Sequence, residues 1–168
     1  RWPNGNTVYL AWELIPTANS SGIIGGKPGS EHEDGGIYCD VIREVNPCGE
    51  LVFEWRMMDH FPFEKYPLRA NRHRYEYAHA NTCFVQKDGN FLLSWRDLDL
   101  IALLDRDSKK LVWQIEDRKW GGQHDPRRLD NGNITIFANG SEQVESEFSR
   151  ILELNPETGE TVRELSLI

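Results

Sequence analysis

The sequence has 168 residues, a length that suits one domain with a hydrophobic core. With 39% hydrophobic and 27% charged residues, its composition is typical of a folded protein and excludes an extensively disordered chain. The formal net charge of −8 argues against a nucleic-acid partner, because such binding depends on neutralising phosphates, and no apolar run reaches the ~20 residues of a membrane-spanning helix.

The first predicted unit covers residues 1–57. It starts with the dipeptide Asn4-Gly5, which predicts a turn, and continues with the strand-like run T-V-Y-L-A-W. We expect the strand that would precede this turn to lie upstream of Arg1. Residues 17–36 are rich in Ser, Gly and Pro and predict a long solvated loop. The unit ends with two strand-like runs, I-Y-C-D-V-I-R-E-V and L-V-F-E-W-R-M, joined by the turn N-P-C-G-E.

Residues 58–78 form an insertion between the first two units. The segment is aromatic, interrupted by prolines, and locally basic within an acidic protein. It is expected to be a surface flap packed by its own rings. The alternative is a lid that helps to select an aromatic anionic substrate.

Two further units follow, at residues 79–117 and 123–167. Each begins with a histidine and a short strand-like run, and then has a turn, Asp88-Gly89 in one and Asn131-Gly132 in the other. Such dipeptides between apolar runs predict hairpins with type I′ turns, which need positive φ at both central residues. Each unit then continues with a strand, a tight turn and a second strand. The sequence therefore repeats a module of about four strands, the size of a propeller blade.

This repeat predicts an all-β fold, a β-propeller fragment of about three four-stranded antiparallel blades. Stacked blades cover both faces of their middle strands, which explains continuous apolar runs such as F-L-L-S-W. Three blades cannot close a ring, since propellers have roughly four to eight. We therefore expect either further blades elsewhere in the protein or self-association of copies that completes the ring.

The two complete units place similar polar residues at the matching ends of their hairpins. Folding about the first turn brings His79 and Asn81 close to Arg96, and folding about the second brings His124 close to Asn139. In a propeller, these ends surround a central channel. Imidazole and guanidinium groups together suit a tetrahedral oxyanion, because arginine donates in pairs and histidine can donate, accept or attack.

Metal and disulfide chemistry have weaker support. The cysteines Cys39, Cys48 and Cys83 form no C-x-x-C motif and are interpreted as small strand or turn residues. A metal site using the histidines lacks a carboxylate or a third histidine at suitable spacing. We therefore predict no metal site and no cofactor.

Several motifs extend this interpretation. The segments Y-A-H-A-N, D-G-N-F-L-L-S-W-R, G-G-Q-H-D, L-D-N-G-N-I-T-I-F-A-N-G and S-R-I-L-E-L-N-P-E-T-G-E-T-V, in this order, resemble the arylsulfotransferase (arylsulfate sulfotransferase) family. The resemblance covers nearly the whole chain. It implies a six-bladed β-propeller, a secreted or periplasmic location, and transfer of a sulfuryl group from an aryl sulfate to a phenol without a nucleotide sulfate donor. The partners are then small aromatic sulfate esters and phenols.

The resemblance also implies roles for individual residues. His124, in the Q-H motif, matches the nucleophile, which would form a sulfohistidine. His79 and Arg96 match the groups that hold the sulfuryl oxygens and the leaving phenolate. Asn81 and Asn139 are expected to contact the substrate.

The sequence departs from the family pattern at two points. A further site histidine would lie upstream of the first residue, so the isolated chain is expected to be inactive. Ala138 stands in F-A-N-G where the family usually has a carboxylate. The alternative function is a non-catalytic propeller that uses the same channel to bind a ligand or a protein.

Overall fold

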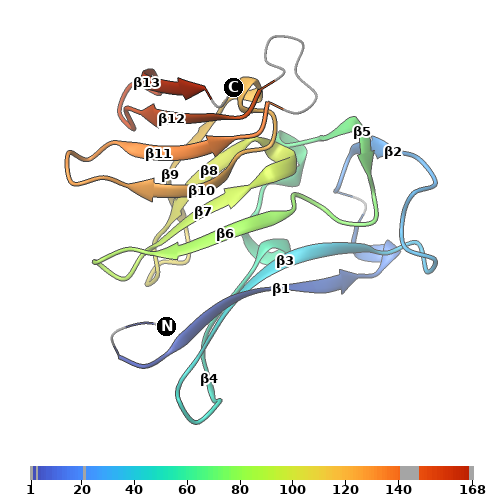
Figure 1. The fold of residues 1–168 in the computed structure, drawn as a ribbon. Coiled ribbons are helices and arrows are strands. Elements are labelled where there is room, and N and C mark those ends of the chain that lie inside the picture. The colour runs from blue at the N-terminus through green and yellow to red at the C-terminus, as the bar shows by residue number, and fades with distance from the viewer. Residues whose placement is uncertain (1, 3, 21, 141–147, 167–168) are drawn as a thin grey trace. The chain divides into compact units, whose positions relative to one another are not determined.

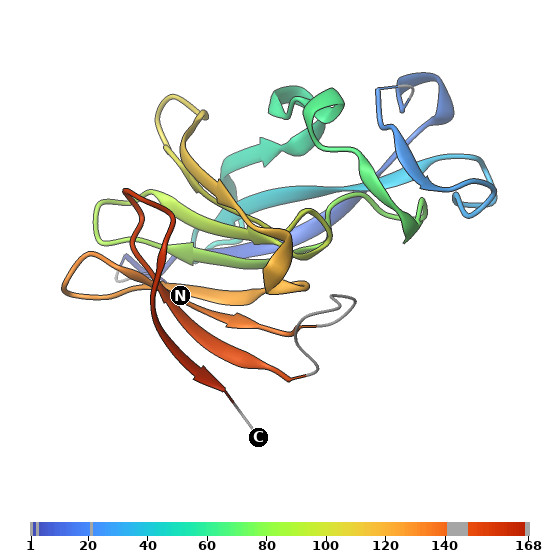
Figure 2. The ribbon, with the colours of Figure 1, turned by 90° about the horizontal axis from the view of Figure 1, so that it is seen from above.

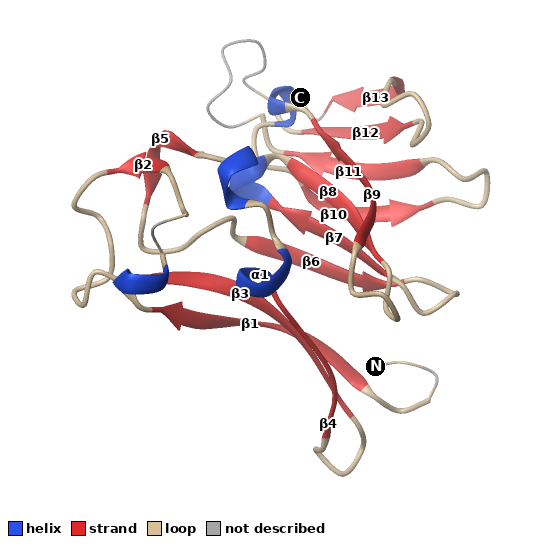
Figure 3. Cartoon of the chain, turned by 180° about the vertical axis from the view of Figure 1, so that it is seen from behind, coloured by secondary structure: helices blue, strands red, loops and turns tan. Residues whose placement is uncertain are grey.

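The computed structural model describes residue 2 and residues 4–20, 22–140 and 148–166. The predicted units also include residues 1, 3, 21, 141–147 and 167, which lie outside the described part. The chain forms two compact units, Arg1–His79 and Ala80–Ile168. Strands dominate both of them (Figures 1 and 3).

The first unit is built around a three-stranded antiparallel sheet with the strand order β1-β3-β4. The bounds of these strands are Thr7–Ile15 for β1, Ile37–Val45 for β3 and Leu51–Arg56 for β4. A single-turn helix, α1 (Met57–His60), directly follows β4. A separate pair joins β2 (Gly25–Lys27) to β5 (Leu68–His73) in parallel.

The prediction of a solvated loop at residues 17–36 is wrong in part, because bonds from the Arg74 side chain hold this segment in place. It contains β2 and a 3₁₀ turn (Thr17–Asn19), and Ile23 is only 3% exposed. The Arg74 guanidinium pairs with Glu31 at 2.6 Å and donates to the carbonyl oxygens of Ile23, at 3.1 Å, and Gly25. An arginine that satisfies these carbonyls allows the loop backbone to be buried.

Aromatic rings pack together in the predicted insertion. Phe61, Phe63, Tyr66 and Tyr77 have neighbouring ring centroids 4.8 to 6.1 Å apart. Phe63 belongs to a second 3₁₀ turn (Phe63–Lys65) and is buried, as is Phe61. These rings give the segment its own apolar cluster, as in a flap packed by its own side chains. The role of the segment as a substrate lid stays a prediction.

The second unit contains two four-stranded antiparallel sheets, each a meander in chain order. The first sheet comprises β6 (Ala80–Val85), β7 (Phe91–Trp95), β8 (Leu100–Leu104) and β9 (Leu111–Glu116). The second comprises β10 (His124–Arg128), β11 (Ile134–Ala138), β12 (Arg150–Leu154) and β13 (Thr161–Ser166). Two 3₁₀ turns, Arg96–Leu98 and Arg118–Trp120, lie in the connections.

An apolar cluster holds these two sheets together, and Figure 2 shows them as successive layers. The cluster comprises Leu92, Ile101, Trp120, Ile134, Ile136, Ala138, Leu152 and Leu154. Each large aliphatic side chain in such a cluster stabilises the fold by roughly 1.5–3 kcal/mol. Every residue of β7 is buried, so its apolar run is continuous because both of its faces are covered.

The predicted hairpins form, but the predicted turn type is wrong. Gly89 and Gly132 have φ of 92° and 90°, whereas Asp88 and Asn131 do not have positive φ. Gly89 N donates to Gln86 O at 3.0 Å, and in the second hairpin Gly132 N donates to Leu129 O at 3.0 Å. This pattern is a type I turn followed by a glycine in the left-handed region. Asp88 Oδ1 accepts from Asn90 N, and Asn131 Oδ1 accepts from Asn133 N, each at 3.0 Å. These side-chain bonds favour this geometry.

Candidate functional site

Four of the predicted site residues lie at one end of the strands of the second unit. Asn81 is near the start of β6, Arg96 directly follows β7, His124 begins β10, and Asn139 directly follows β11. The registers place these ends together within each sheet, since Ala80 pairs with Trp95 and His124 pairs with Phe137. The meander therefore gathers, at one edge, residues that are far apart in sequence.

His124 has a geometry that fixes its ring. Its Nδ1 lies 3.1 Å from Gly122 O, which can only accept, and 3.2 Å from Asn139 Nδ2, which can only donate. The tautomer with the proton on Nδ1 donates to Gly122 O, and the other tautomer accepts from Asn139. In the first tautomer the lone pair of the neutral imidazole lies on Nε2.

A buried carboxylate holds the loop that supplies this carbonyl. Gly121 and Gly122 have φ of 62° and 84°, a left-handed backbone that favours glycine. Gly122 N donates to Asp99 Oδ1 at 2.9 Å, and Asp99 is 1% exposed. Asp99 thus fixes the peptide next to the carbonyl that orients His124.

Gln123 ties His124 to the end of the neighbouring sheet. It is fully buried, and its side-chain Nε2 lies 3.0 Å from Ser94 Oγ, 3.2 Å from Trp95 O and 3.0 Å from Leu100 O. Trp95 precedes Arg96, and Gln123 precedes His124. One buried amide therefore positions the backbone beside both predicted site residues.

Asn81 strengthens the same junction. Its amide donates to Gln123 O at 2.8 Å, across the two sheets of the unit. The Thr82 hydroxyl donates to Asn81 Oδ1 at 3.3 Å and accepts from Asp125 N at 3.1 Å. These bonds show Asn81 as a structural link between the sheets, and its predicted contact with substrate stays a prediction.

Arg96 is paired with its sequence neighbour. Its guanidinium lies 3.0 Å from Asp97 Oδ1, and the side chains are 27% and 7% exposed, respectively. The carboxylate restricts the guanidinium without enclosing it, so part of the charge still faces solvent. That Arg96 and His124 bind the same anion stays a prediction.

His79 closes the first unit, and its position relative to Arg96 and His124 stays a prediction. Within its own unit, Nδ1 lies 2.6 Å from Glu76 Oε1, and the ring is 6.4 Å from that of Trp12. Both Ala78 and His79 have a left-handed backbone, with φ of 73° and 56°. Such φ values are unusual for residues with a Cβ and often mark functional sites.

The remaining reactive groups lie apart from these residues. Burial raises the pKa of the Cys39 and Cys83 thiols to about 12, which disfavours the reactive thiolate at both positions. All three cysteines are free. Within the described ranges, no group of three or more His, Cys, Asp or Glu side chains is arranged to hold a metal ion. None of the helices described is long and apolar enough to cross a membrane.

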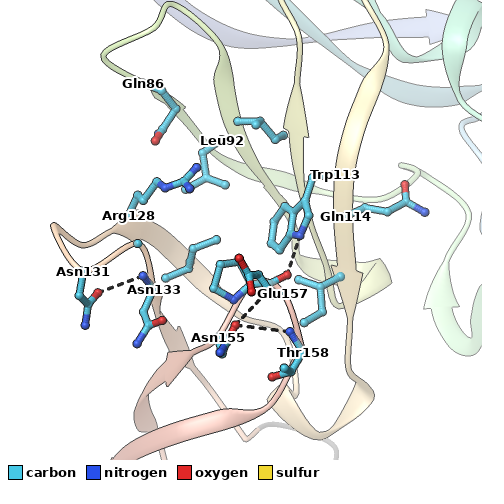
Figure 4. Close-up of a pocket in the computed structure, with 16 residues that line it drawn as sticks. Gln86, Leu92, Trp113, Gln114, Arg128, Asn131, Asn133, Asn155, Glu157 and Thr158 are labelled. Atoms are coloured by element: carbon cyan, nitrogen blue, oxygen red, sulfur yellow. Dashed lines mark hydrogen bonds between the residues drawn. The ribbon is translucent and has the colours of Figure 1, made fainter.

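A cavity of about 830 Å³ opens at the opposite end of the strands, between the two sheets of the second unit (Figure 4). The indole of Trp113 forms one wall, held by a 2.9 Å bond from its Nε1 to Pro156 O. Arg128 and Asn133 line the side formed by β10, β11 and their turn. The sequence did not predict this cavity, because its wall residues come from several strands and turns that meet only in the folded unit.

Sequence reasoning also missed the groups that orient the two histidines. Glu76 stands three residues before His79, and Gln123 directly precedes His124 in the G-G-Q-H-D motif. Asp99 stands 23 residues before the glycine that it binds. The spacing of Glu76 and His79, three residues apart, could have predicted their contact from the sequence. The contact between Asp99 and Gly122 could be found only from the folded structure.

Comparisons with known proteins place the chain in a family. No curated protein matches it significantly. Among solved structures, one of a protein of unknown function from Bacteroides caccae is 16% identical, with a TM-score of 0.47 over 80% of this chain and 43% of that one. A virginiamycin B lyase from Staphylococcus aureus is 15% identical, with a TM-score of 0.45 over 95% of this chain and 46% of that one. The chain thus spans less than half the length of these proteins. The model of the Arylsulfotransferase (ASST) family matches residues 19–167, and the chain therefore belongs to this family.

Proposed function

We propose that this chain forms part of an arylsulfotransferase that moves a sulfuryl group from an aryl sulfate to a phenol through a sulfohistidine at His124. The observation that carries the proposal is the 3.1 Å contact between His124 Nδ1 and Gly122 O. A proton on Nδ1 that donates to this carbonyl leaves the lone pair on Nε2, and the proposal assigns this tautomer to His124. Family membership supplies the reaction class.

The reaction divides into two displacements. His124 Nε2 attacks sulfur, an N–S bond forms, and the S–O bond to the donor breaks to release a phenolate. The acceptor phenol then loses its proton as its oxygen bonds to sulfur, and the N–S bond breaks to restore the imidazole. Sulfuryl transfer resembles loose phosphoryl transfer, so positioning and charge stabilisation dominate. Arg96 and His79 supply that stabilisation in this proposal.

The test is mass spectrometry of the full-length protein after brief exposure to a chromogenic aryl sulfate. We expect one added sulfuryl group, on His124. His124→Ala should remove both the modification and the release of phenol. His79→Ala and Arg96→Ala should lower turnover by roughly 10²-fold or more, as the loss of transition-state stabilising groups generally does. Turnover that survives in His124→Ala refutes the nucleophile.

We further propose that the two sheets of the second unit are consecutive propeller blades. Their meander topology and the apolar cluster between them support this arrangement. A ring of six blades would be completed by the rest of the protein or by self-association, and sedimentation of the full-length protein separates these two cases. Secretion or a periplasmic location and small aromatic partners belong to the same proposal, because they come from the family resemblance.

A second candidate function, a non-catalytic ligand-binding module, is favoured by the cavity beside Trp113. Its volume of about 830 Å³ suits a small molecule. Calorimetry with a non-hydrolysable aryl sulfonate distinguishes the two functions. Under this alternative, binding is lost in Trp113→Ala and kept in His124→Ala, and no sulfuryl transfer occurs.

A further inference from the structure

A carboxylate holds His79. Glu76 Oε1 lies 2.6 Å from His79 Nδ1, and the two side chains are 20% and 35% exposed, respectively. A carboxylate only accepts, so Nδ1 carries the proton in this contact. The lone pair of the neutral ring then lies on Nε2, and a proton added there gives an imidazolium that faces the Glu76 charge.

Backbone bonds fix Glu76 on both sides. Tyr38 N donates to Tyr75 O at 3.0 Å, and Tyr77 N donates to Tyr38 O at 2.7 Å. Glu76 itself forms a β-bridge with Tyr38. Tyr77 is 1% exposed, and its hydroxyl donates to Tyr66 O at 2.8 Å, which anchors the chain next to Glu76. Glu76 is therefore a rigid support for the histidine.

The backbone of His79 is constrained as well. Its left-handed φ of 56°, directly after Ala78 at 73°, is disfavoured for residues with a Cβ. The Glu76 carboxylate hydrogen-bonds to the imidazole, and the Trp12 ring lies beside it with the two ring centroids 6.4 Å apart. An unusual backbone that these contacts maintain is typical of a residue whose orientation matters.

Other ionisable groups lie close to this cluster. Asp40 pairs with Trp12 in the β1–β3 register, so both side chains lie on one face of the sheet, and Asp40 is 1% exposed. The His32 ring packs on Tyr38 and Tyr75 with centroids 5.6 and 5.8 Å apart. The Glu76 carboxylate is hydrogen-bonded to His79 through Oε1, and its Oε2 is buried without a hydrogen-bond partner among the described residues. Its charge is thus directed mainly at the imidazole.

We propose that Glu76 is a positioning residue that makes His79 the proton carrier of the transferase, an inference that rests on the proposed function. In the first displacement, the imidazolium Nε2–H gives its proton to the phenolate as the S–O bond breaks. In the second, the neutral Nε2 takes the proton of the acceptor phenol as its oxygen bonds to sulfur and the N–S bond to His124 breaks. Glu76 keeps Nδ1 protonated throughout and stabilises the imidazolium.

The first test reads the His79 tautomer by ¹⁵N NMR and needs no turnover. In the ¹⁵N-labelled protein, Nδ1 of the neutral ring should carry the proton. Glu76→Ala should move that proton to Nε2, while the amide spectrum shows that the fold is kept. Asp34→Asn removes another carboxylate, 3.5 Å from His32, and should leave His79 unchanged. An unchanged tautomer in Glu76→Ala overturns the proposal.

The second test is kinetic. In the full-length protein, Glu76→Gln should lower kcat about 10-fold or more with little change in KM, and Glu76→Asp should restore part of the rate. The pH optimum of Glu76→Gln should move to lower pH, because an imidazolium without its carboxylate loses its proton more easily. A purely structural role would lower stability without moving the pH profile, and that result overturns the proposal. If the wild type transfers no sulfuryl group, the proposed function fails, while the NMR result still decides whether Glu76 positions His79.

Discussion

Replacing Gln123 by methionine tests the junction beneath the candidate site. Methionine has a similar shape and no donor, so the substitution removes hydrogen bonds while leaving little empty volume. Nε2 has two N–H groups for three nearby acceptors, Ser94 Oγ, Trp95 O and Leu100 O, at 3.0 to 3.2 Å. At most two bonds are therefore lost at full strength.

The expected loss of stability follows from the burial of the Gln123 side chain. A net hydrogen bond contributes about 1 kcal/mol, and a buried acceptor left without its donor costs about 1–3 kcal/mol. Since Gln123 is fully buried, water cannot replace the amide. We expect Gln123→Met to lower the free energy of unfolding by about 3 kcal/mol. With a urea slope of about 2 kcal/mol per molar, the midpoint should fall by about 1.5 M.

Urea unfolding followed by circular dichroism measures this midpoint. Gln114→Met is the matched control, because Gln114 is exposed on β9 and the same substitution there should change the free energy by less than about 0.5 kcal/mol. A Gln123→Met midpoint equal to that of the control would show that the amide does not hold the two sheets. The proposed support for His124 would then be lost.

Other outcomes follow from turns, burial and charge. Gly159→Ala puts a Cβ on a backbone with φ of +77° and within 3.0 Å of Ile115 Cδ1, so urea unfolding should show a loss of about 1–2 kcal/mol. In native protein at about pH 8, peptide mass spectrometry should find a thiol label on exposed Cys48 and none on Cys39, whose pKa burial raises to about 12. Hydrogen bonds from Asn133 and Asn131 lower the pKa of Glu153 below its ordinary 4.5. This carboxylate thus stabilises the fold above that pH and loses its contribution as the pH falls through the folded value. Glu153→Gln should flatten the acid side of the stability–pH curve, and an unchanged curve would contradict this assignment.

Local sequence signals predicted the hairpins of the second unit because their turn residues act over a few positions. Gly89 and Gly132 are needed where φ is positive, and the apolar runs on either side set which strands pair. The turn type was wrong because the side chains of Asp88 and Asn131 bind the backbone N–H two residues later. That local bond favours a type I turn over type I′.

Long-range pairings were beyond the sequence pattern. The parallel pairing of β2 with β5 joins residues about 45 positions apart, and β2 has only three residues, two of them glycines. Neither strand has the alternating apolar pattern that marks a half-buried strand. The bonds from Arg74 to this loop likewise depend on residues more than 40 positions away. Composition therefore favoured a solvated loop, and tertiary contacts decided otherwise.

The candidate site, too, has parts that the sequence predicted and parts that depend on long-range contacts. Motif resemblance predicted site roles for His79, Arg96 and His124, which stay predictions, but it did not point to the groups that hold the two histidines. Ala138, where the family usually has a carboxylate, is fully buried in the apolar cluster of the second unit. An alanine there extends the core, and among the described residues Asp99 is a carboxylate that binds the Gly121-Gly122 loop directly before His124.

The two candidate histidines differ in the charge of the group that accepts from Nδ1. In the proposed tautomer the acceptor for His124 is a neutral carbonyl, Gly122 O, whereas the acceptor for His79 is the carboxylate of Glu76. A neutral acceptor fixes the tautomer without adding a charge that favours the imidazolium, which suits a nucleophile that must keep its lone pair. A carboxylate fixes the same tautomer and also stabilises the protonated ring, which suits a proton carrier. The distinction predicts that Glu76→Gln changes the pH dependence of transfer while His124 can still be sulfated. A Glu76→Gln variant that forms no sulfohistidine would show instead that the two histidines do not divide the work in this way.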